Sequence, residues 1–112
     1  MDANTFAALG EPSRLQMVGL LRERPRSVGD LAEALSIRQP QVSKHLRVLR
    51  EAGIVEAEPV ARRRIYHLRA EPFEQISVWV HTFEQQWEAR LNALDTFLHA
   101  TGEPNRDRRA RP

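Results

Sequence analysis

The strongest constraint on the fold is a run of apolar residues at helical spacing between a proline and a glycine. Val42, Leu46 and Leu49 are separated by four and then three residues, which places them on one face of a helix. Pro40 is tolerated in the first turn of such a helix. Gly53 suits the left-handed residue that follows a last turn. The stretch therefore predicts a helix with one buried face and an opposite face that is polar.

A shorter helix is predicted just before this one. Ser27 followed by Asp30 is a variant of the capping box and leads into a helix of about two turns over residues 28–35. Residues 36–38 form a short connector, and Gln39 is the predicted cap of the second helix. Two helices joined by a tight connector, with glycine closing the second, are the layout of a helix-turn-helix.

Two short segments rich in β-branched and aromatic residues follow, over residues 54–58 and 64–68. They are predicted to form a hairpin, with the break between them at residues 59–63. The tip of this two-stranded ribbon is basic. A basic ribbon directly after a helix-turn-helix is the wing of a winged helix. The expected fold is mainly α, with a small two-stranded β wing.

The end of the chain carries a long apolar stripe. From Pro72 to about Ala100 apolar residues recur at spacings of three and four, which predicts one long helix. The residues of the stripe are Phe73, Ile76, Val80, Phe83, Trp87, Leu91, Leu94 and Leu98. A domain of this size cannot cover such a helix, so we expect part of it to meet a second subunit. Residues 1–102 are predicted to form one domain, and residues 103–112 a disordered basic tail.

The charge distribution singles out the middle of the chain. The net charge of the 112 residues is +2. Residues 40–69 carry seven basic against three acidic side chains, whereas residues 71–103 carry one basic against six acidic. The middle is therefore the candidate for binding an anionic partner.

The composition limits the cellular compartments and the kinds of chemistry that we expect for this chain. The chain has no cysteine, which excludes disulfides and thiolate chemistry. No apolar run approaches the roughly 18 residues of a membrane span, and the N-terminus lacks the pattern of a signal peptide. We expect a cytoplasmic protein that does not contact a membrane.

The polar face of the predicted helix at residues 39–52 carries side chains able to read base edges in a DNA major groove, and the ribbon carries arginines able to reach phosphates or the minor groove. The candidate DNA-binding residues are Gln39, Gln41, Ser43, Lys44, Arg47, Arg62, Arg63 and Arg64. His45 lies near the core edge of the helix and is expected to pack rather than to contact bases.

Residues 6–68 resemble the ArsR-type (ArsR/SmtB-like) winged helix-turn-helix repressors. The run QPQVSKHLRVLREAGIV carries the resemblance, because it joins the Val-Ser-x-His-Leu core of a recognition helix to the Leu-x-x-Ala-Gly-Ile-Val exit into the wing. The resemblance implies a homodimeric repressor that binds double-stranded DNA at an inverted repeat and dimerises through its first and last helices. The interface residues expected from it are Phe6, Leu9, Trp79, Phe83, Trp87, Leu91, Leu94 and Leu98.

The chain departs from this family in two places. The metal-sensing branch uses a Cys-x-Cys pair that is absent here, so we expect a metal-independent protein without a cofactor. Zinc could be bound only by an unusual set of ligands across the dimer, such as His81 with Glu84 or Asp95 with His99. In the wing, Ala61 or Val60 stands where a glycine often makes the turn, and we expect a longer or less tight loop.

Other classes of function remain as alternatives. One is a repressor that responds to a metal or a small ligand through a histidine and carboxylate site, or an aromatic site, at the dimer interface. Another is a protein-interaction adaptor that uses the last helix. An enzyme is not expected, because the sequence has no Gly-rich phosphate loop, no nucleophile elbow and no His-Glu-x-x-His run.

Overall fold

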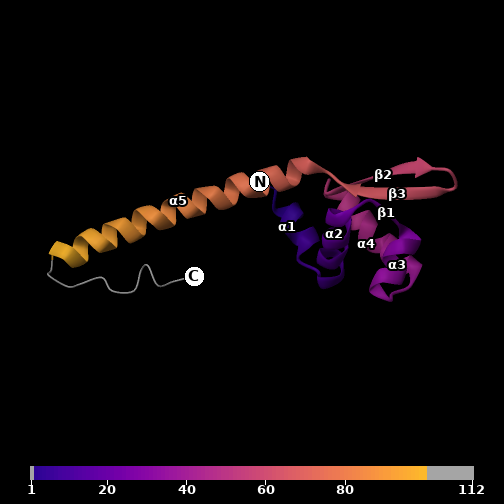
Figure 1. Cartoon of the computed structure of the whole chain (residues 1–112), viewed down its shortest axis with the longest axis horizontal. Helices are drawn as coiled ribbons and strands as arrows, with labels where there is room; N and C mark the ends of the chain where they lie inside the picture. Colours follow the sequence, from indigo (N-terminus) through magenta and orange to yellow (C-terminus); the bar gives the residue numbers. More distant parts are fainter. Residues whose placement is uncertain (1, 101–112) are drawn as a thin grey trace. The chain divides into compact units, whose positions relative to one another are not determined.

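The computed structural model describes residues 2–100 as helices and short strands (Figure 1). The elements are α1 (Ala3–Leu9), α2 (Pro12–Glu23), β1 (Arg26–Ser27), α3 (Val28–Leu35), α4 (Gln39–Glu51), β2 (Val55–Val60), β3 (Arg63–Leu68) and α5 (Ala70–Ala100). The chain divides into two units, Met1–Ile76 and Ser77–Pro112. The first unit holds the winged helix-turn-helix, and the described part of the second is the remainder of α5. The tail predicted at residues 103–112 lies outside the described residues.

The helices begin where local chemistry satisfies their first amide groups. The capping box predicted for α3 is confirmed, with Ser27 Oγ accepting from the Asp30 amide and the Asp30 carboxylate accepting from the Ser27 amide, both at 3.1 Å. The side chain of Glu11 caps α2 by accepting from the amide of Arg14 at 2.9 Å. Pro12 occupies the first turn of α2, where its missing N–H costs nothing.

Helix α4 starts one residue earlier than predicted. The N-cap is Arg38, whose carbonyl accepts from Gln41 and Val42, so the prediction that Gln39 is the cap is wrong. Gln39 is the first helical residue and Pro40 the second. Arg38 caps without a side-chain hydrogen bond. The sequence signal therefore pointed to the wrong residue, because proline is accepted at either of the first two helical positions.

The exit from α4 follows the predicted glycine motif. Gly53 has φ +75°, a left-handed conformation that favours glycine. Its amide donates to the carbonyl of Arg50 and the amide of Ile54 donates to that of Leu49, both at 2.9 Å, which is the Schellman pattern. Ile54 and Val55 are then fully buried and lead the chain into β2.

The sheet has three antiparallel strands in the order β1-β3-β2 rather than the two that were predicted. Strand β1 has only two residues, with Arg26 opposite Tyr66 and Ser27 opposite Ile65. A segment this short shows no alternation of apolar and polar residues, so periodicity could not predict it.

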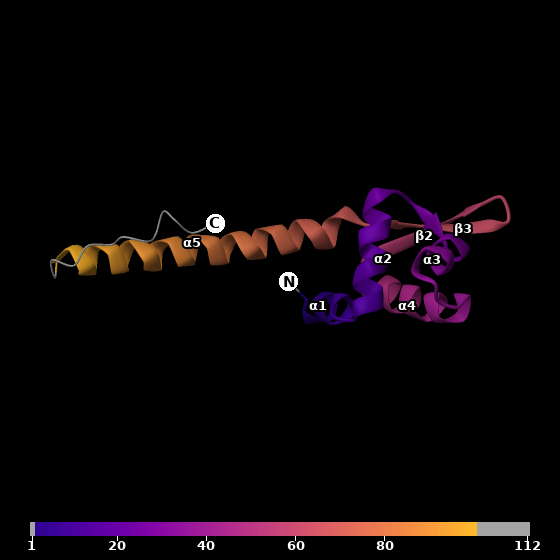
Figure 2. The same cartoon turned by 60° about the horizontal axis from the view of Figure 1, so that its bottom comes forward.

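The β2 and β3 hairpin is tighter than predicted. Val60 pairs with Arg63, so the turn is Ala61 and Arg62 alone, and the expectation of a longer loop is wrong. Ala61 takes φ +55°, the conformation that a glycine would adopt without strain. Pro59 stays within β2, which is an edge strand and can lack one amide donor. Both views show the hairpin extending past the helices of the first unit (Figure 1 and Figure 2).

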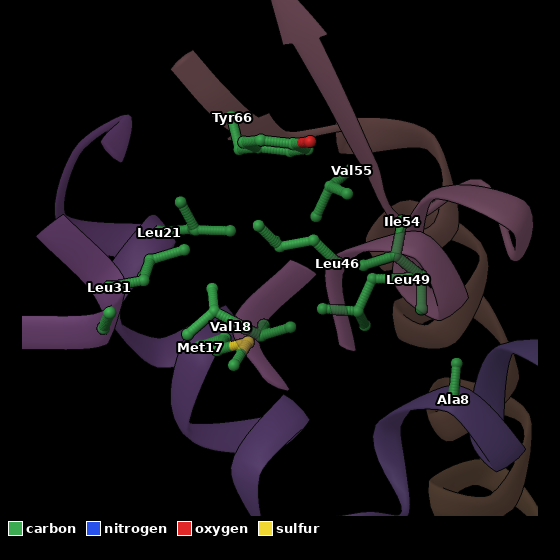
Figure 3. Close-up of a cluster of buried hydrophobic side chains, with 12 residues drawn as sticks. Ala8, Met17, Val18, Leu21, Leu31, Leu46, Leu49, Ile54, Val55 and Tyr66 are labelled. Carbon is green, nitrogen blue, oxygen red and sulfur yellow. The ribbon is translucent and has the colours of Figure 1, made fainter. Parts of the chain in front are cut away.

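The core of the first unit gathers apolar side chains from α1 to α4 and from the sheet. Figure 3 shows them converging on one cluster. Its largest fully buried members are Met17, Leu31, Val42, Leu46, Leu49, Ile54 and Val55. The three residues that defined the predicted buried face of α4 are all among them. Leu15, which shares the periodic pattern of α2, is instead 56% exposed.

Helix α5 confirms the long helix predicted from Pro72 to Ala100, and begins two residues earlier. Phe73, near its start, packs on the core of the first unit. From Ser77 to Ala100 no residue is buried. None of the described helices combines the length and apolar character needed to cross a bilayer.

Candidate nucleic-acid interface

The outer face of α4 presents a row of polar side chains. Because Val42, Leu46 and Leu49 are buried to 1% exposure or less, the helix has a fixed rotation about its axis. That rotation leaves exposed every α4 residue that the sequence assigned to DNA. These residues are Gln39, Gln41, Ser43, Lys44 and Arg47. The structure thus brings the five predicted side chains to one solvent-facing surface, which we call the reading face.

Arg47 is the one residue of the reading face with a side-chain ion pair in the described structure. Its Nε donates to Glu51 Oε1 at 3.1 Å, one helical turn away. Both side chains are more than 60% exposed, and a surface pair of this kind contributes only about 0–1 kcal/mol. The guanidinium of Arg47 can therefore exchange this carboxylate for a phosphate at little cost.

The wing brings a second basic surface. Arg62 lies in the two-residue turn, is exposed, and has no ion pair within residues 2–100. Arg64 is exposed as well, and its guanidinium carbon lies 5.9 Å from the centre of the Tyr66 ring, a cation–π distance. Because Tyr66 is 8% exposed and part of the core, the guanidinium of Arg64 lies beside a fixed ring.

Arg63 differs from its two neighbours. Its Nη2 donates to Ser27 Oγ and, at 2.8 Å, to Asp30 Oδ2. The prediction that all three wing arginines face DNA does not anticipate this contact, which joins residues more than 30 positions apart in the sequence. All three arginines are exposed, but only Arg63 is bound at the start of α3 through side-chain hydrogen bonds within residues 2–100.

Two acidic residues of β2 lie close to nitrogen atoms of His67 in β3 and of Arg69 just after β3. Glu56 lies 3.1 Å from Arg69 Nε and 3.9 Å from His67 Nε2, and Glu58 lies 3.5 Å from the same His67 nitrogen. In the sequence nothing marked His67 as functional. Arg69, paired with Glu56, offsets one of the two negative charges that β2 would otherwise present to an anion.

A polar cluster behind the reading face links three helices. Arg14 Nε donates to the carbonyl of Ala8 at the end of α1 at 2.6 Å, and its Nη1 lies 3.5 Å from His45 Nδ1 on α4. His45 Nδ1 also lies 3.6 Å from Glu11, so the expectation that His45 packs against other helices is confirmed. The Arg14 amide hydrogen bond holds the pKa of Glu11 below its ordinary value of 4.5.

Sequence reasoning missed Arg14, although a signal was available. An arginine in the first turn of a helix runs against the helix dipole, which favours acids there. Such a residue is tolerated when it has a compensating acceptor, and here the acceptors are the last carbonyls of α1. The side chain therefore fixes the C-terminal end of α1 next to α2 and α4.

The described part of the second unit presents the apolar stripe of α5 to solvent. Trp79 and Phe83 pack edge to face, with ring centres 4.8 Å apart. Trp87 is 56% and Leu94 is 49% exposed, whereas Leu91 and Leu98 are half-buried. In the first unit, Phe6 is 37% exposed and Leu9 packs against the core. Most of the residues predicted to form a subunit interface are thus accessible within a single chain.

Two histidine and carboxylate pairs lie along α5. His81 Nδ1 is 3.8 Å from Glu84, and His99 Nδ1 is 3.7 Å from Asp95. Each pair supplies two potential ligands from one helix. Within residues 2–100 of one chain, no three histidine, cysteine or acidic side chains come together in a way that could hold a metal ion.

A two-helix motif with an exposed polar second helix, closed by a basic hairpin, defines a winged helix-turn-helix protein. Comparison with known proteins agrees with this class. Residues 11–57 match the family described as "Bacterial regulatory protein, arsR family". The transcriptional repressor BigR from Xylella fastidiosa is 37% identical, with a TM-score of 0.60 over 72% of this chain and 83% of that one. The chain belongs to the arsR family of bacterial regulatory proteins.

Two further relatives support this placement. The transcriptional regulator NmtR from Mycobacterium tuberculosis is 46% identical over 66 residues, which are 59% of this chain and 55% of that protein. A homodimeric winged helix-turn-helix DNA-binding domain from Mycobacterium bovis is 27% identical, with a TM-score of 0.62 over 75% of this chain and 78% of that one. The chain spans about half the length of the first curated relatives it matches. The family and these relatives are transcriptional regulators and not enzymes.

Proposed function

We propose that the protein is a sequence-specific DNA-binding repressor of transcription. The observation that carries this proposal is the reading face of α4, which is fixed in rotation by a buried opposite face and followed by a basic wing. Support also comes from BigR, which is described as a transcriptional repressor. A DNA target places the action of the protein in the cytoplasm.

In this proposal α4 enters the major groove and the wing lies over the neighbouring backbone. Gln39, Gln41 and Ser43 have side chains that can both donate to and accept from base edges, and Lys44 adds a donor for guanine. Arg47 takes a phosphate in place of Glu51. Arg62 and Arg64 contact phosphates or a narrow minor groove, which attracts arginine.

We also propose that the protein acts as a homodimer through α1 and the stripe of α5. The relative from Mycobacterium bovis is described as homodimeric. On α5, Val80, Phe83 and Trp87 repeat eleven residues later as Leu91, Leu94 and Leu98. An eleven-residue repeat keeps its stripe on one side of a nearly straight helix, so two copies can pair along it without a left-handed supercoil. A two-fold protein requires a two-fold operator, hence an inverted repeat.

Fluorescence anisotropy tests the proposal. The protein is titrated against DNA from upstream of its own gene and against a scrambled duplex of equal length, at two salt concentrations. We expect tighter binding to the upstream duplex, with an affinity that falls steeply as salt rises. Equal, weak binding to both duplexes would contradict an operator in that region. No binding to either duplex at low salt would support the adaptor alternative, which uses the exposed aromatic side chains of α5.

Metal response is the second arm of the same experiment. The pairs His81 with Glu84 and Asp95 with His99 supply two ligands each, so a four-ligand site requires a dimer that brings two such pairs together. We propose a metal-independent protein, for which binding with chelator and with added zinc is the same. A change of affinity on adding zinc, abolished by His81→Ala, would overturn this in favour of a metal-responsive repressor.

A further inference from the structure

The three consecutive arginines of the wing do not share one environment. All three are exposed, but in the described structure Arg63 is bound to residues at the start of α3, whereas Arg62 and Arg64 form no ion pair. Its Nη2 donates both to Ser27 Oγ and to Asp30 Oδ2, the latter at 2.8 Å. We call these two contacts the wing tether.

The acceptors of the wing tether are the two members of the α3 capping box. Ser27 Oγ already accepts from the Asp30 amide, and the Asp30 carboxylate from the Ser27 amide. Ser27 is also the last residue of β1, where the sheet passes into α3. The Arg63 guanidinium thus contacts the point at which the wing, strand β1 and the helix-turn-helix meet.

The sheet register shows why such a tether is needed. Strand β1 pairs only with Tyr66 and Ile65 of β3. From Arg64 to the turn, β3 has β2 as its only partner strand, although both strands continue to Val60 and Arg63. A two-stranded ribbon on its own is marginally stable in water. Through Ser27 and Asp30, Arg63 joins the distal half of the ribbon to the body of the unit.

We propose that Arg63 is a positioning residue, which through Ser27 and Asp30 sets the place of the wing relative to the helix-turn-helix. This inference rests on the proposed DNA-binding function, because it assigns to the wing tether the presentation of Arg62 and Arg64 to DNA. Arg63 itself contacts protein in the complex and not DNA.

Removing the wing tether should alter the placement of the wing more than the free energy of unfolding of the whole protein. Both side chains of the ion pair are about half exposed, at 57% and 47%, and pairs this exposed add little to the free energy of unfolding. Loss of the wing tether gives the distal ribbon more conformational freedom. DNA binding must then remove more conformational entropy from the ribbon, which weakens the affinity. We expect Arg63→Ala to weaken DNA binding about threefold to tenfold, within the usual range of coupling between residues in contact.

Substitution of Asp30 shows whether Arg63 positions the wing or contacts DNA directly, because the two roles predict opposite changes in DNA affinity. Removing a negative charge near DNA strengthens binding when charge alone matters. Asp30→Asn removes that charge, breaks the ion pair with Arg63 and leaves an amide oxygen to accept from Ser27. If the wing tether positions the wing, Asp30→Asn weakens binding. The matched control is Glu33→Gln, an exposed acid on the same helix outside the tether, which should leave binding unchanged or slightly tighter.

The decisive experiment measures affinity and its salt dependence for Arg63→Ala, Asp30→Asn and the double variant, with Arg62→Ala for comparison. We expect the double variant to bind no worse than either single variant. We expect the salt slope of Arg63→Ala to match that of the unsubstituted protein, whereas Arg62→Ala flattens it by about 0.9 per lost phosphate contact. Arg63→Lys, which keeps the positive charge and N–H donors on its ammonium group, should restore most of the affinity.

Hydrogen exchange of the protein without DNA tests the wing tether independently of DNA binding. Arg63→Ala and Asp30→Asn should each speed exchange of the amides between Glu58 and Arg64, with the core amides of α4 unchanged. Unaltered exchange in the ribbon would overturn the inference even if the protein binds DNA. Tighter DNA binding by Asp30→Asn, together with a flatter salt slope for Arg63→Ala, would also overturn it and make Arg63 a DNA contact.

Discussion

Ala61 shows how one residue can carry strain that its sequence position does not reveal. Its φ of +55° lies in the left-handed region, where a Cβ costs about 1 kcal/mol or more. The cost is accepted because the strands on either side pair completely up to Val60 and Arg63. A turn with a strained alanine is thus stable in the context of a paired hairpin.

We predict that Ala61→Gly stabilises the protein by about 0.5–1 kcal/mol, since glycine adopts this φ without strain but loses more entropy on folding. Urea denaturation measures the change as a higher midpoint at an unchanged slope. Ala57→Gly, in the paired part of β2, is the control and should lower the midpoint instead. A lower midpoint for Ala61→Gly would show that the turn is not strained.

Asp30 links stability to pH. The Ser27 amide, which hydrogen-bonds the carboxylate, is the largest cause of the lowered pKa of Asp30, with the Ser27 hydroxyl and Arg63 adding to it. A carboxyl whose pKa is lower in the folded protein contributes stability above its ordinary value, here 3.8, and loses it as pH falls through the folded value.

We therefore predict that thermal stability falls as pH is lowered below about 4 and that Asp30→Asn makes this fall shallower. The measurement is the unfolding midpoint of both proteins from pH 7 down to pH 2. Glu33→Gln removes an equal charge outside the capping box and should keep the acid dependence of the unsubstituted protein. Parallel curves for all three proteins would contradict the role of Asp30.

At the scale of elements, the proposed function divides the recognition of DNA between α4 and the wing. The reading face of α4 carries groups that distinguish bases, whereas the wing carries arginines that neutralise phosphates. The two surfaces therefore predict different responses to mutation, one selective for sequence and the other not.

We predict that Ser43→Ala costs about 1–3 kcal/mol on the operator and relaxes the preference at one symmetric pair of positions. Arg62→Ala should weaken binding to operator and scrambled DNA alike and flatten the salt slope by about 0.9 per lost contact, or twice that per dimer. Anisotropy titrations on operator variants at several salt concentrations measure both effects. A change of sequence preference in Arg62→Ala would contradict the assignment of phosphate contact.

At the scale of the whole molecule, the apolar stripe of α5 is a surface that a single chain leaves exposed. Trp87 and Leu94 are each about half exposed within one chain, and an apolar row of this length on a monomer indicates an interface. Because the same stripe is present on every copy, a two-fold partner can cover it with itself.

We predict that Leu91→Glu converts the dimer to a monomer and lowers DNA affinity, since a monomer engages only half of an inverted repeat. Sedimentation equilibrium should give one chain mass for the variant and two for the unsubstituted protein. Gln85→Glu adds the same charge on the opposite side of α5 and should stay dimeric. A monomeric protein without any substitution would instead remove the dimer from the proposal.

Several features of the fold could be predicted from the sequence because their causes are local. The buried face of α4 follows from the spacing of Val42, Leu46 and Leu49, and the start of α3 from Ser27 and Asp30 three residues apart. The exit at Gly53 depends on hydrogen bonds within a single turn. Each signal lies within one helix, so no knowledge of distant residues was needed.

Tertiary structure alone decided what depends on residues far apart in the chain. The two residues of β1 form a strand only because β3 lies beside them, and Ala61 takes a left-handed conformation only because both flanking strands are paired. In the sequence Arg63 is indistinguishable from Arg62, yet its partners are Asp30 on α3 and the N-cap Ser27, which lie 33 and 36 residues away. Sequence fixes which side chains can bind an anion, whereas long-range packing determines which of them are already bound to the protein itself.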